Sequence, residues 1–516
     1  MGIRGHPILR AFNGRLAFVT LILFSSSINY GLDIIAFSST QALDAFEEKF
    51  GVFDPKKKTW IIEPYFLSLL NSLTYVGQLA GVLLGGYVNN RWGRRMSFRI
   101  MTLWAWLGAI LLVTAQVKEQ MLAGRIINYV YQGMEIVSIP VMQAEICPAQ
   151  LRGAVVSSYW IGILIGSLIM SLVVYGTKHI EGEASFRIPF GIFFIVPTLV
   201  FVSTRWMTES PRWLLTQDRP EEALISLRKY RQGNFTEDEI MEEYAEQVAL
   251  ISTTKARGTL KELFQGPNRR RTIIAVLFNI ILQITGNAFV IKYGTIFLKD
   301  IKAVDPFALN NINSSLYIVA TGLCMYLCEH KLFGRKRLLL ISSVVQAGAL
   351  LALAGIGTHR VMSHTDGVAI SSLLTISYFA FCFGWGPLSH AVTAEIPSPH
   401  LRNYTYALSS SGNVLISFLV AFTVPYLYYE PYAALGPKIG FIYGGGAVIS
   451  FAFVWFCIPE CRGLTLEEVD HLFKQATPIR EFSKHKTGAV LPVNVKQTLE
   501  EKVLVPAIHN ETTLAV

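Results

Sequence analysis

Charged residues are scarce in this chain, and cysteines are few and scattered. Asp, Glu, Lys and Arg make up 16% of the 516 residues, whereas a soluble domain typically carries about 25%. The six cysteines form no CxxC pair and no Cys/His cluster, which argues against a zinc site or a disulfide scaffold. Patterns for a nucleophile elbow, a phosphate loop or metal ligation are also missing. The sequence therefore favours neither an enzyme nor a protein with a metal or other cofactor.

Hydrophobic residues dominate instead, at 52% of the chain. Twelve segments approach the roughly 20 apolar residues that a membrane-spanning helix needs. They are 16–37, 66–88, 98–116, 120–143, 154–176, 188–206, 272–298, 312–330, 338–358, 369–392, 404–428 and 438–458. The net charge of +9 fits the positive-inside rule for membrane proteins, so we do not interpret it as a nucleic-acid-binding surface. These patterns predict an all-α protein whose partners include the lipid bilayer.

The distribution of basic residues predicts the orientation. Arg91, Arg94, Arg95 and Arg99 surround the loop after the second span, and Arg335, Lys336 and Arg337 follow the eighth. With these loops in the cytoplasm, twelve spans put both termini there too. We expect a six-helix bundle over residues 1–206, a helical cytoplasmic loop over 207–271, a second six-helix bundle over 272–462 and a cytoplasmic tail over 463–516.

The two predicted halves repeat each other. Gly93-Arg94-Arg95 recurs as Gly334-Arg335-Lys336. Glu145 with Arg152 recurs as Glu395 with Arg402, and Glu209 with Arg212 recurs approximately as Glu460 with Arg462. Similar offsets in the same orientation indicate a parallel duplication, which implies a central site between the halves.

The repeated charges also suggest a two-state latch. Carboxylates and guanidiniums at the cytoplasmic helix ends can pair across the halves when the inner gate is shut, and part when it opens. The simpler alternative is that the basic residues only anchor each loop. The predicted gate residues are Arg91, Arg94, Arg95, Glu145, Arg152, Glu209, Arg212, Arg335, Glu395, Arg402, Glu460 and Arg462.

Five motifs closely resemble the sugar-porter branch of the major facilitator superfamily, over about residues 30–470. The motifs are Gly86–Arg95, Pro140–Gly153, Glu209–Leu214, Ala394–Pro397 with Arg402, and Pro459–Thr465. The chain is most similar to fungal hexose and disaccharide proton symporters. The resemblance implies two six-helix bundles (the major facilitator fold), location in the plasma membrane and proton-coupled sugar uptake.

Several positions depart from the family pattern. An acidic residue usual in the loop after span two is Asn90, and its counterpart after span eight is Lys331. The glutamine usual in span five is Trp160, and a tryptophan usual in span ten is His390. Sugar as the substrate is therefore less firmly indicated than transport itself.

Ionisable residues within spans are costly and suggest function. Asp33 lies in span one, where proton-coupled relatives carry the proton acceptor. Arg125 lies at similar depth in span four, so we expect the two to pair. The alternative is a fixed structural salt bridge.

A polar stripe follows helical spacing along span four: Arg125, Asn128, Gln132 and Glu135. Glu135 near mid-membrane either binds substrate or takes a second proton, unless it is a packing residue. Lys292 would lie opposite Gln283 on a straight helix and reach the outer interface, unless Gly286 breaks that helix.

The candidate substrate-binding residues come from the polar stripe, from aromatic residues within spans and from the family motifs. Trp160 and Trp385 could stack on a sugar or simply pack, and His390 could face the cavity or bond a backbone carbonyl. The set is Gln132, Trp160, Gln283, Asn287, Trp385, His390 and Asn413.

We weighed three functions. The first is proton-coupled uptake of a sugar or polyol, with protons and a small molecule as partners. The second is import or efflux of a non-sugar metabolite, favoured by Glu135, Trp160 and His390. The third is a non-transporting nutrient sensor, which we consider least favoured because sensors of this fold tend to have long signalling tails, while only about 50 residues follow the last motif here.

Overall fold

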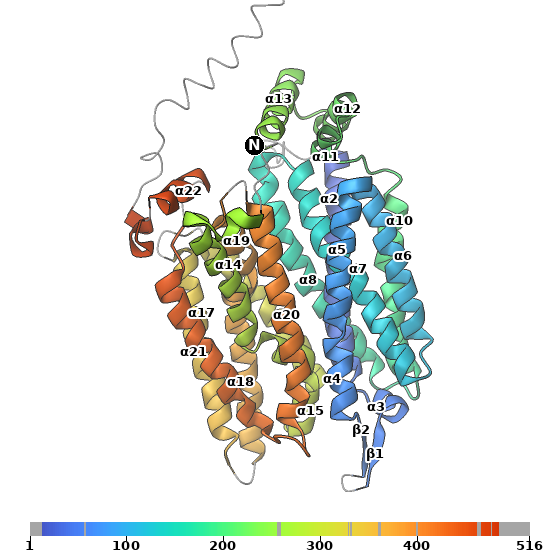
Figure 1. Ribbon diagram of the computed structural model, residues 1–516. Coiled ribbons are helices and arrows are strands. Elements are labelled where there is room, and N and C mark those ends of the chain that lie inside the picture. Colours follow the sequence, from blue (N-terminus) through green and yellow to red (C-terminus); the bar gives the residue numbers. More distant parts are fainter. Residues whose placement is uncertain are drawn as a thin grey trace, which may run out of the picture.

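The computed structural model describes residues 13–55, 58–254, 260–328, 330, 333–359, 363–398, 401–461, 466–475 and 477–484. Figure 1 shows two helical bundles side by side, the N-terminal one in blue to teal and the C-terminal one in green to orange. Helices α11–α13 lie at one end of the molecule, here named the α12 end. Strands β1 and β2 lie at the other, here named the hairpin end.

The N-terminal bundle contains six spans, two of which are interrupted. Its elements are α2 (Gly14–Thr40), α4 (Pro64–Ser72) followed by α5 (Thr74–Trp92), α6 (Arg94–Val113), α7 (Lys118–Ile146), α8 (Ala149–Thr177), and α9 (Ala184–Gly191) joined by η2 (Ile192–Phe194) to α10 (Ile195–Ser203). Between α2 and α4 come α3 (Asp44–Phe50) and an antiparallel hairpin of β1 (Val52–Asp54) and β2 (Thr59–Ile61) that pairs Val52 with Ile61.

The C-terminal bundle repeats this pattern. Its elements are α14 (Gly266–Ile284) followed by α15 (Asn287–Ile301), α16 (Pro306–Cys328), α17 (Gly334–Ile356), α18 (His364–Phe383) followed by α19 (Trp385–Glu395), α20 (Arg402–Tyr428), and η4 (Gly436–Ile439) leading into α21 (Gly440–Cys457). Each predicted span coincides with one of the twelve helical segments. The protein is therefore an all-α membrane protein with twelve transmembrane helices in two six-helix bundles.

Ten of these segments are long and apolar enough to qualify as spans by composition alone. The other two are α7 and α16. Polar side chains lower the hydropathy of α7, among them Arg125, Asn128, Gln132 and Glu135, and three of these four are at most 1% exposed. Polar residues in a span are tolerated when they face the protein interior rather than lipid.

The segments outside the spans are also helical. They are α11 (Pro211–Thr216), α12 (Pro220–Arg231), α13 (Glu237–Thr254) and η3 (Leu260–Phe264) between the bundles, and α22 (Leu466–Lys474) and η5 (Ile479–Lys484) after them. Pro220 begins α12 with two glutamates in its first turn, a favourable start for a helix. Thr236 and Glu239 bond reciprocally at the start of α13, which is a capping box.

Glycine allows very close helix packing inside the N-terminal bundle. A Cβ atom added to Gly31 of α2 would lie 1.8 Å from the carbonyl oxygen of Ile163 in α8. Gly81 and Gly133 make a similar close approach where α5 crosses α7. The approach of α5 at Gly81 and Gly133 holds α7, which carries the polar stripe, in its bundle.

Candidate functional site

Asp33 lies at the centre of a buried polar cluster. Its side chain in α2 is 2% exposed and lies beside three side chains of α7. Asn128 Nδ2 donates to Asp33 Oδ1 at 2.7 Å, and Gln132 Nε2 donates to Oδ2. Arg125 Nη1 lies 3.5 Å from Oδ1. The structure thus brings together the aspartate and the arginine that the sequence paired, and it adds two neutral donors.

Arg125 is held loosely for a buried guanidinium. Its Cζ lies 3.8 Å from the centre of the Phe37 ring and 4.9 Å from that of Tyr129. Its Nε and Nη1 atoms meet no hydrogen-bond acceptor among the described residues. A pair that keeps unused donors can rearrange at lower cost than one in which every donor is bound.

Glu135 lies further along α7, in a setting of hydroxyl groups. It is fully buried, with Ser26 of α2 and Tyr131 close by. Neither carboxylate oxygen has a hydrogen-bond partner in the described part of the chain. Ten residues separate it from Arg125, about 15 Å along a helix axis. Glu135 therefore does not pair with Arg125, and no cation pairs with it among the described residues.

Gly286 breaks the seventh span and decides where Lys292 points. Gly286 has φ +89°, a conformation that L side chains rarely adopt, and it separates α14 from α15. The straight-helix prediction for Lys292 was wrong, because the break resets the rotation of α15. Lys292 is 5% exposed and donates to the hydroxyl of Tyr129 in the opposite bundle.

The predicted substrate-binding residues occupy different surroundings. Gln283 Nε2 donates to Asn413 Oδ1 at 3.2 Å, which joins α14 to α20. Asn287 Oδ1 is buried and has no hydrogen-bond partner among the described residues. Gln132 bonds Asp33. The side chain of His390 lies outside the description.

The two tryptophans differ. Trp385 is fully buried, stacks on Phe278 with centroids 5.0 Å apart and donates to Ser343 at 2.8 Å. This places it in the core of its own bundle, as in the packing alternative. Trp160 lines a pocket between the bundles.

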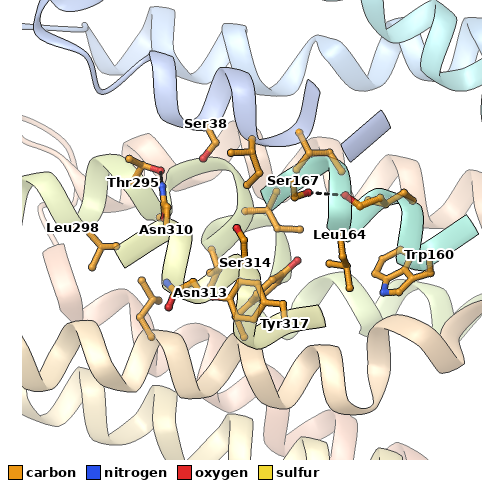
Figure 2. A pocket seen from close by; sticks show the side chains of 18 residues that line it. Ser38, Trp160, Leu164, Ser167, Thr295, Leu298, Asn310, Asn313, Ser314 and Tyr317 are labelled. Atoms are coloured by element: carbon orange, nitrogen blue, oxygen red, sulfur yellow. Dashed lines mark hydrogen bonds between the residues drawn. The ribbon is translucent and has the colours of Figure 1, made fainter. Parts of the chain in front are cut away.

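That pocket includes residues that sequence reasoning missed (Figure 2). Polar side chains from α2, α8, α15 and α16 line it, namely Ser38, Ser167, Thr295, Asn310, Asn313 and Ser314. Asn310 Nδ2 donates to Thr295 Oγ1 at 2.8 Å. The signal in the sequence was the unusual polarity of the eighth span around 310–315, which the motif comparison did not use.

The repeated charges at the α12 end form two equivalent clusters. Arg94 pairs with Glu145 at 2.6 Å, and Arg335 pairs with Glu395. Glu209 accepts from the backbone N–H of Arg94 and Arg95, and Glu460 accepts from those of Arg335 and Lys336. Each glutamate thus binds a helix N-terminus, where anions are favoured.

The prediction that such charges pair across the halves when the inner gate is shut stays a prediction. In this structure the described pairs lie within bundles. The physical reason is proximity: α6 packs directly against the end of α7 in one bundle, and α17 lies beside α19 in the other. Arg91 is exposed at the end of α5, and Arg95 donates to the Thr204 carbonyl at 3.0 Å. Arg212 lies in the first turn of α11. Arg462 and the side chains of Arg152 and Arg402 lie outside the description.

The hairpin end joins the two bundles. Lys299 of α15 bonds Asp44 and Glu47 of α3, each at 2.8 Å. Lys178, directly after α8, pairs with Asp305 ahead of α16. Deeper in, Ser68 Oγ donates to the Phe422 carbonyl at 2.7 Å, and Gln41 Nε2 donates to that of Lys292 at 2.6 Å. The structure is therefore closed at this end.

We expect this closure to depend on pH through Glu47. Burial raises the pKa of the Glu47 carboxyl to about 7, although Lys299 lowers it, while Asp44 and Asp300 raise it further. In a state that exposes Glu47 to water its pKa would fall to an ordinary value near 4.3. Protonation therefore favours closure: the closed state gains stability as the pH falls below about 7, and loses that gain as the pH rises through it.

Spin labels on α3 and on the loop between α20 and η4 would measure this. We expect longer distances at pH 8 than at pH 5.5, and little pH dependence in Glu47→Gln. A pH dependence that survives unchanged in Glu47→Gln would contradict this role.

Twelve spans in two mutually repeated bundles, with ionisable side chains buried between them, define a transporter of the major facilitator class. The chain belongs to the sugar (and other) transporter family, whose model matches residues 18–473. This confirms the resemblance drawn from the five motifs. Its relatives include hexose transporters and a glucose sensor rather than enzymes.

Individual relatives and structures agree with this assignment. The high glucose sensor RGT2 of Saccharomyces cerevisiae is 29% identical over 438 residues, which are 82% of this chain but only 57% of the sensor. The hexose transporter HXT13 of the same yeast is 25% identical over 491 residues, 92% of this chain and 86% of the relative. The inward open structure of the E. coli xylose transporter XylE matches with a TM-score of 0.72 at 22% identity, covering 89% of this chain and 99% of XylE.

Proposed function

We propose that this protein takes up a sugar or sugar-like solute together with protons, by alternating access. The observation that carries the proposal is the buried Asp33, held by Asn128 and Gln132 with Arg125 at 3.5 Å. A carboxylate at membrane depth is costly unless it is paired or protonated. Opening the pair would expose Asp33 to a proton, and closing it would release that proton.

The solute would bind between the bundles, near the pocket in Figure 2. Hydroxyl and amide groups such as those of Ser38, Asn310 and Asn313 can exchange hydrogen bonds with a polyhydroxylated molecule. Gln132, Trp160, Gln283, Asn287, Trp385, His390 and Asn413 remain candidates for contact with the solute. For Trp385 this requires the C-terminal bundle to rearrange. Glu135 would serve as a second proton acceptor or accept hydrogen bonds from the solute.

Orientation follows from the positive-inside rule. The clusters around Arg94 and Arg335 would lie in the cytoplasm with both termini, and the hairpin end would face outward. Closure at the hairpin end then makes this an inward-facing state of a plasma-membrane protein. The charge clusters would hold the cytoplasmic ends of each bundle rigid as the bundles rock.

The test is proton flux in oriented proteoliposomes that enclose a pH-sensitive dye. Hexoses, pentoses, polyols and disaccharides are added one at a time. We expect at least one to acidify the lumen, and tracer uptake of that solute to depend on the pH gradient. Tracer uptake that does not depend on pH would show that the protein transports the solute without coupling it to protons.

Two other functions have specific support. A non-sugar metabolite is favoured by Glu135, which lacks a cationic partner among the described residues, and by Trp160 at the pocket. A sensor is favoured by the similarity to RGT2. Tracer flux of a non-sugar metabolite would identify the first of these functions. Saturable sugar binding without any flux would identify a sensor.

A further inference from the structure

Two buried cations share one aromatic ring in the centre of the molecule. Lys292 Nζ lies 4.7 Å from the centre of the Tyr129 ring and donates to its hydroxyl. Arg125 Cζ lies 4.9 Å from the same centre. Lys292 comes from the C-terminal bundle and Arg125 from the N-terminal one. Closing the bundles therefore brings a second positive charge to the Asp33–Arg125 pair.

The described anions do not balance these charges. Asp33 is the carboxylate within range of both Lys292 and Arg125. Glu135 is about 15 Å from Arg125 along α7, and neither of its carboxylate oxygens has a hydrogen-bond partner among the described residues. With Asp33 ionised, the cluster carries one positive charge in excess. With Asp33 protonated, as the proposed coupling requires, the excess is two.

Unfilled donors accompany the excess charge. Arg125 is 1% exposed, yet its Nε and Nη1 atoms have no hydrogen-bond acceptor in the described residues. Ring faces of Phe37, Tyr75 and Tyr129 stabilise the cations in part. An aromatic face, however, accepts no strong hydrogen bond from a guanidinium. The Nε–H group and the Nη1 amino group point to different sides of the guanidinium, and each can donate a charge-assisted hydrogen bond to a carboxylate oxygen.

We propose that Arg125 and Lys292 together form a subsite for the carboxylate of an acidic, polyhydroxylated solute such as a sugar acid. This rests on the proposed function and narrows its substrate class. The carboxylate would enter while the bundles are apart at the hairpin end, when Lys292 is separated from Tyr129. Closure would then bring the lysine to the bound anion. One proton moving with one carboxylate carries no net charge, so uptake would respond to the pH gradient and not to the membrane potential.

The experiment compares matched solutes that differ in one group. Gluconate and sorbitol share a six-carbon polyol chain, and galacturonate and galactose share a ring; in each pair, one member has a carboxylate where the other has a CH2OH group. Tracer uptake and thermal stabilisation are measured with the full chain, for the wild type, Lys292→Met and Lys292→Arg. We expect the wild type to prefer the anionic members. Lys292→Met should weaken that preference tenfold or more, as about one lost charge-assisted hydrogen bond would. Lys292→Arg should keep it.

Each alternative outcome is informative. Proton-coupled uptake of sorbitol or galactose without any preference for their acids overturns the inference and leaves the proposed function intact. Uptake of the acids without proton movement supports the subsite and contradicts the coupling. If Lys292→Met slows both members of a pair equally, the lysine acts only in closure and the subsite is wrong. If Lys292→Met does not fold, the wild type alone tests the inference. A wild type that neither gluconate nor galacturonate stabilises overturns it.

Discussion

Replacing Asp33 by asparagine should abolish uphill accumulation while sparing exchange of solute across the membrane. Asparagine has the shape of aspartate but cannot take up a proton, so the pH gradient would no longer be coupled to the solute. Gln132 can turn its amide to bind the new side chain, because its Oε1 has no partner among the described residues. A gradient of one pH unit can drive about tenfold accumulation per proton. That ratio should fall to about one.

Two assays separate coupling from folding. Counterflow, in which unlabelled solute inside exchanges with tracer outside, should proceed in Asp33→Asn and show that the protein is folded and moving. Glu48→Gln is the matched control, since Glu48 is an exposed carboxylate of α3 near the hairpin. It should accumulate solute like the wild type. Undiminished accumulation by Asp33→Asn would shift the proton site to another group, with Glu135→Gln as the next variant.

Placing a single methyl group on Gly31 should destabilise the N-terminal bundle severely. The added Cβ would lie 1.8 Å from the Ile163 carbonyl oxygen and 2.9 Å from the Ser167 backbone nitrogen. Backbone atoms cannot rotate aside as a side chain can, so α2 and α8 would have to separate. Overpacking of this kind typically costs about 1–3 kcal/mol and occasionally more. We expect Gly31→Ala to lower the midpoint of thermal unfolding in detergent by many degrees or to prevent folding.

Gly86→Ala is the control because it makes the same chemical change without a clash. No atom lies within 4 Å of the position its Cβ would take. Alanine in a helix interior is favoured over glycine by about 1 kcal/mol, so this variant should be as stable as the wild type or slightly more stable. Equal thermal midpoints for the two variants would show that α2 and α8 are not packed as described.

Much of the architecture follows from sequence patterns. Apolar length predicted all twelve spans, including α7, where Asp33's partners interrupt the hydrophobicity. The repeated motifs predicted two equivalent halves, and in both bundles a glycine with positive φ precedes the helix N-terminus that binds a glutamate. Helical spacing along α7 also placed Arg125, Asn128 and Gln132 on one face, and all three reach Asp33. Local periodicity was sufficient here because each contact depends on a single helix face.

Features that depend on tertiary packing could not be predicted. The rotation of α15 depends on the backbone angles at Gly286, which spacing alone does not reveal. Trp385 faces Phe278 because α19 packs on α14, a relation between helices far apart in sequence. The pocket in Figure 2 combines side chains from both bundles, and none of those that α16 contributes belongs to a motif. Charge pairing within bundles rather than between them likewise follows from which helix ends are neighbours.

The short helix α15 has a mechanical consequence. The residues that flank it, Gly286 before it and Lys302 after it, both have the left-handed backbone conformation. Its two lysines, Lys292 and Lys299, are seven residues apart, so they project from nearly the same side about 10 Å from each other. One reaches Tyr129 in the membrane interior, and the other reaches α3 at the surface. Because α15 is one continuous helix between these two residues, we expect it to move as a single body, so that both lysines leave their partners together. Opening at the hairpin end should therefore be all-or-none, with the surface ion pairs and the interior hydrogen bond breaking in a single event.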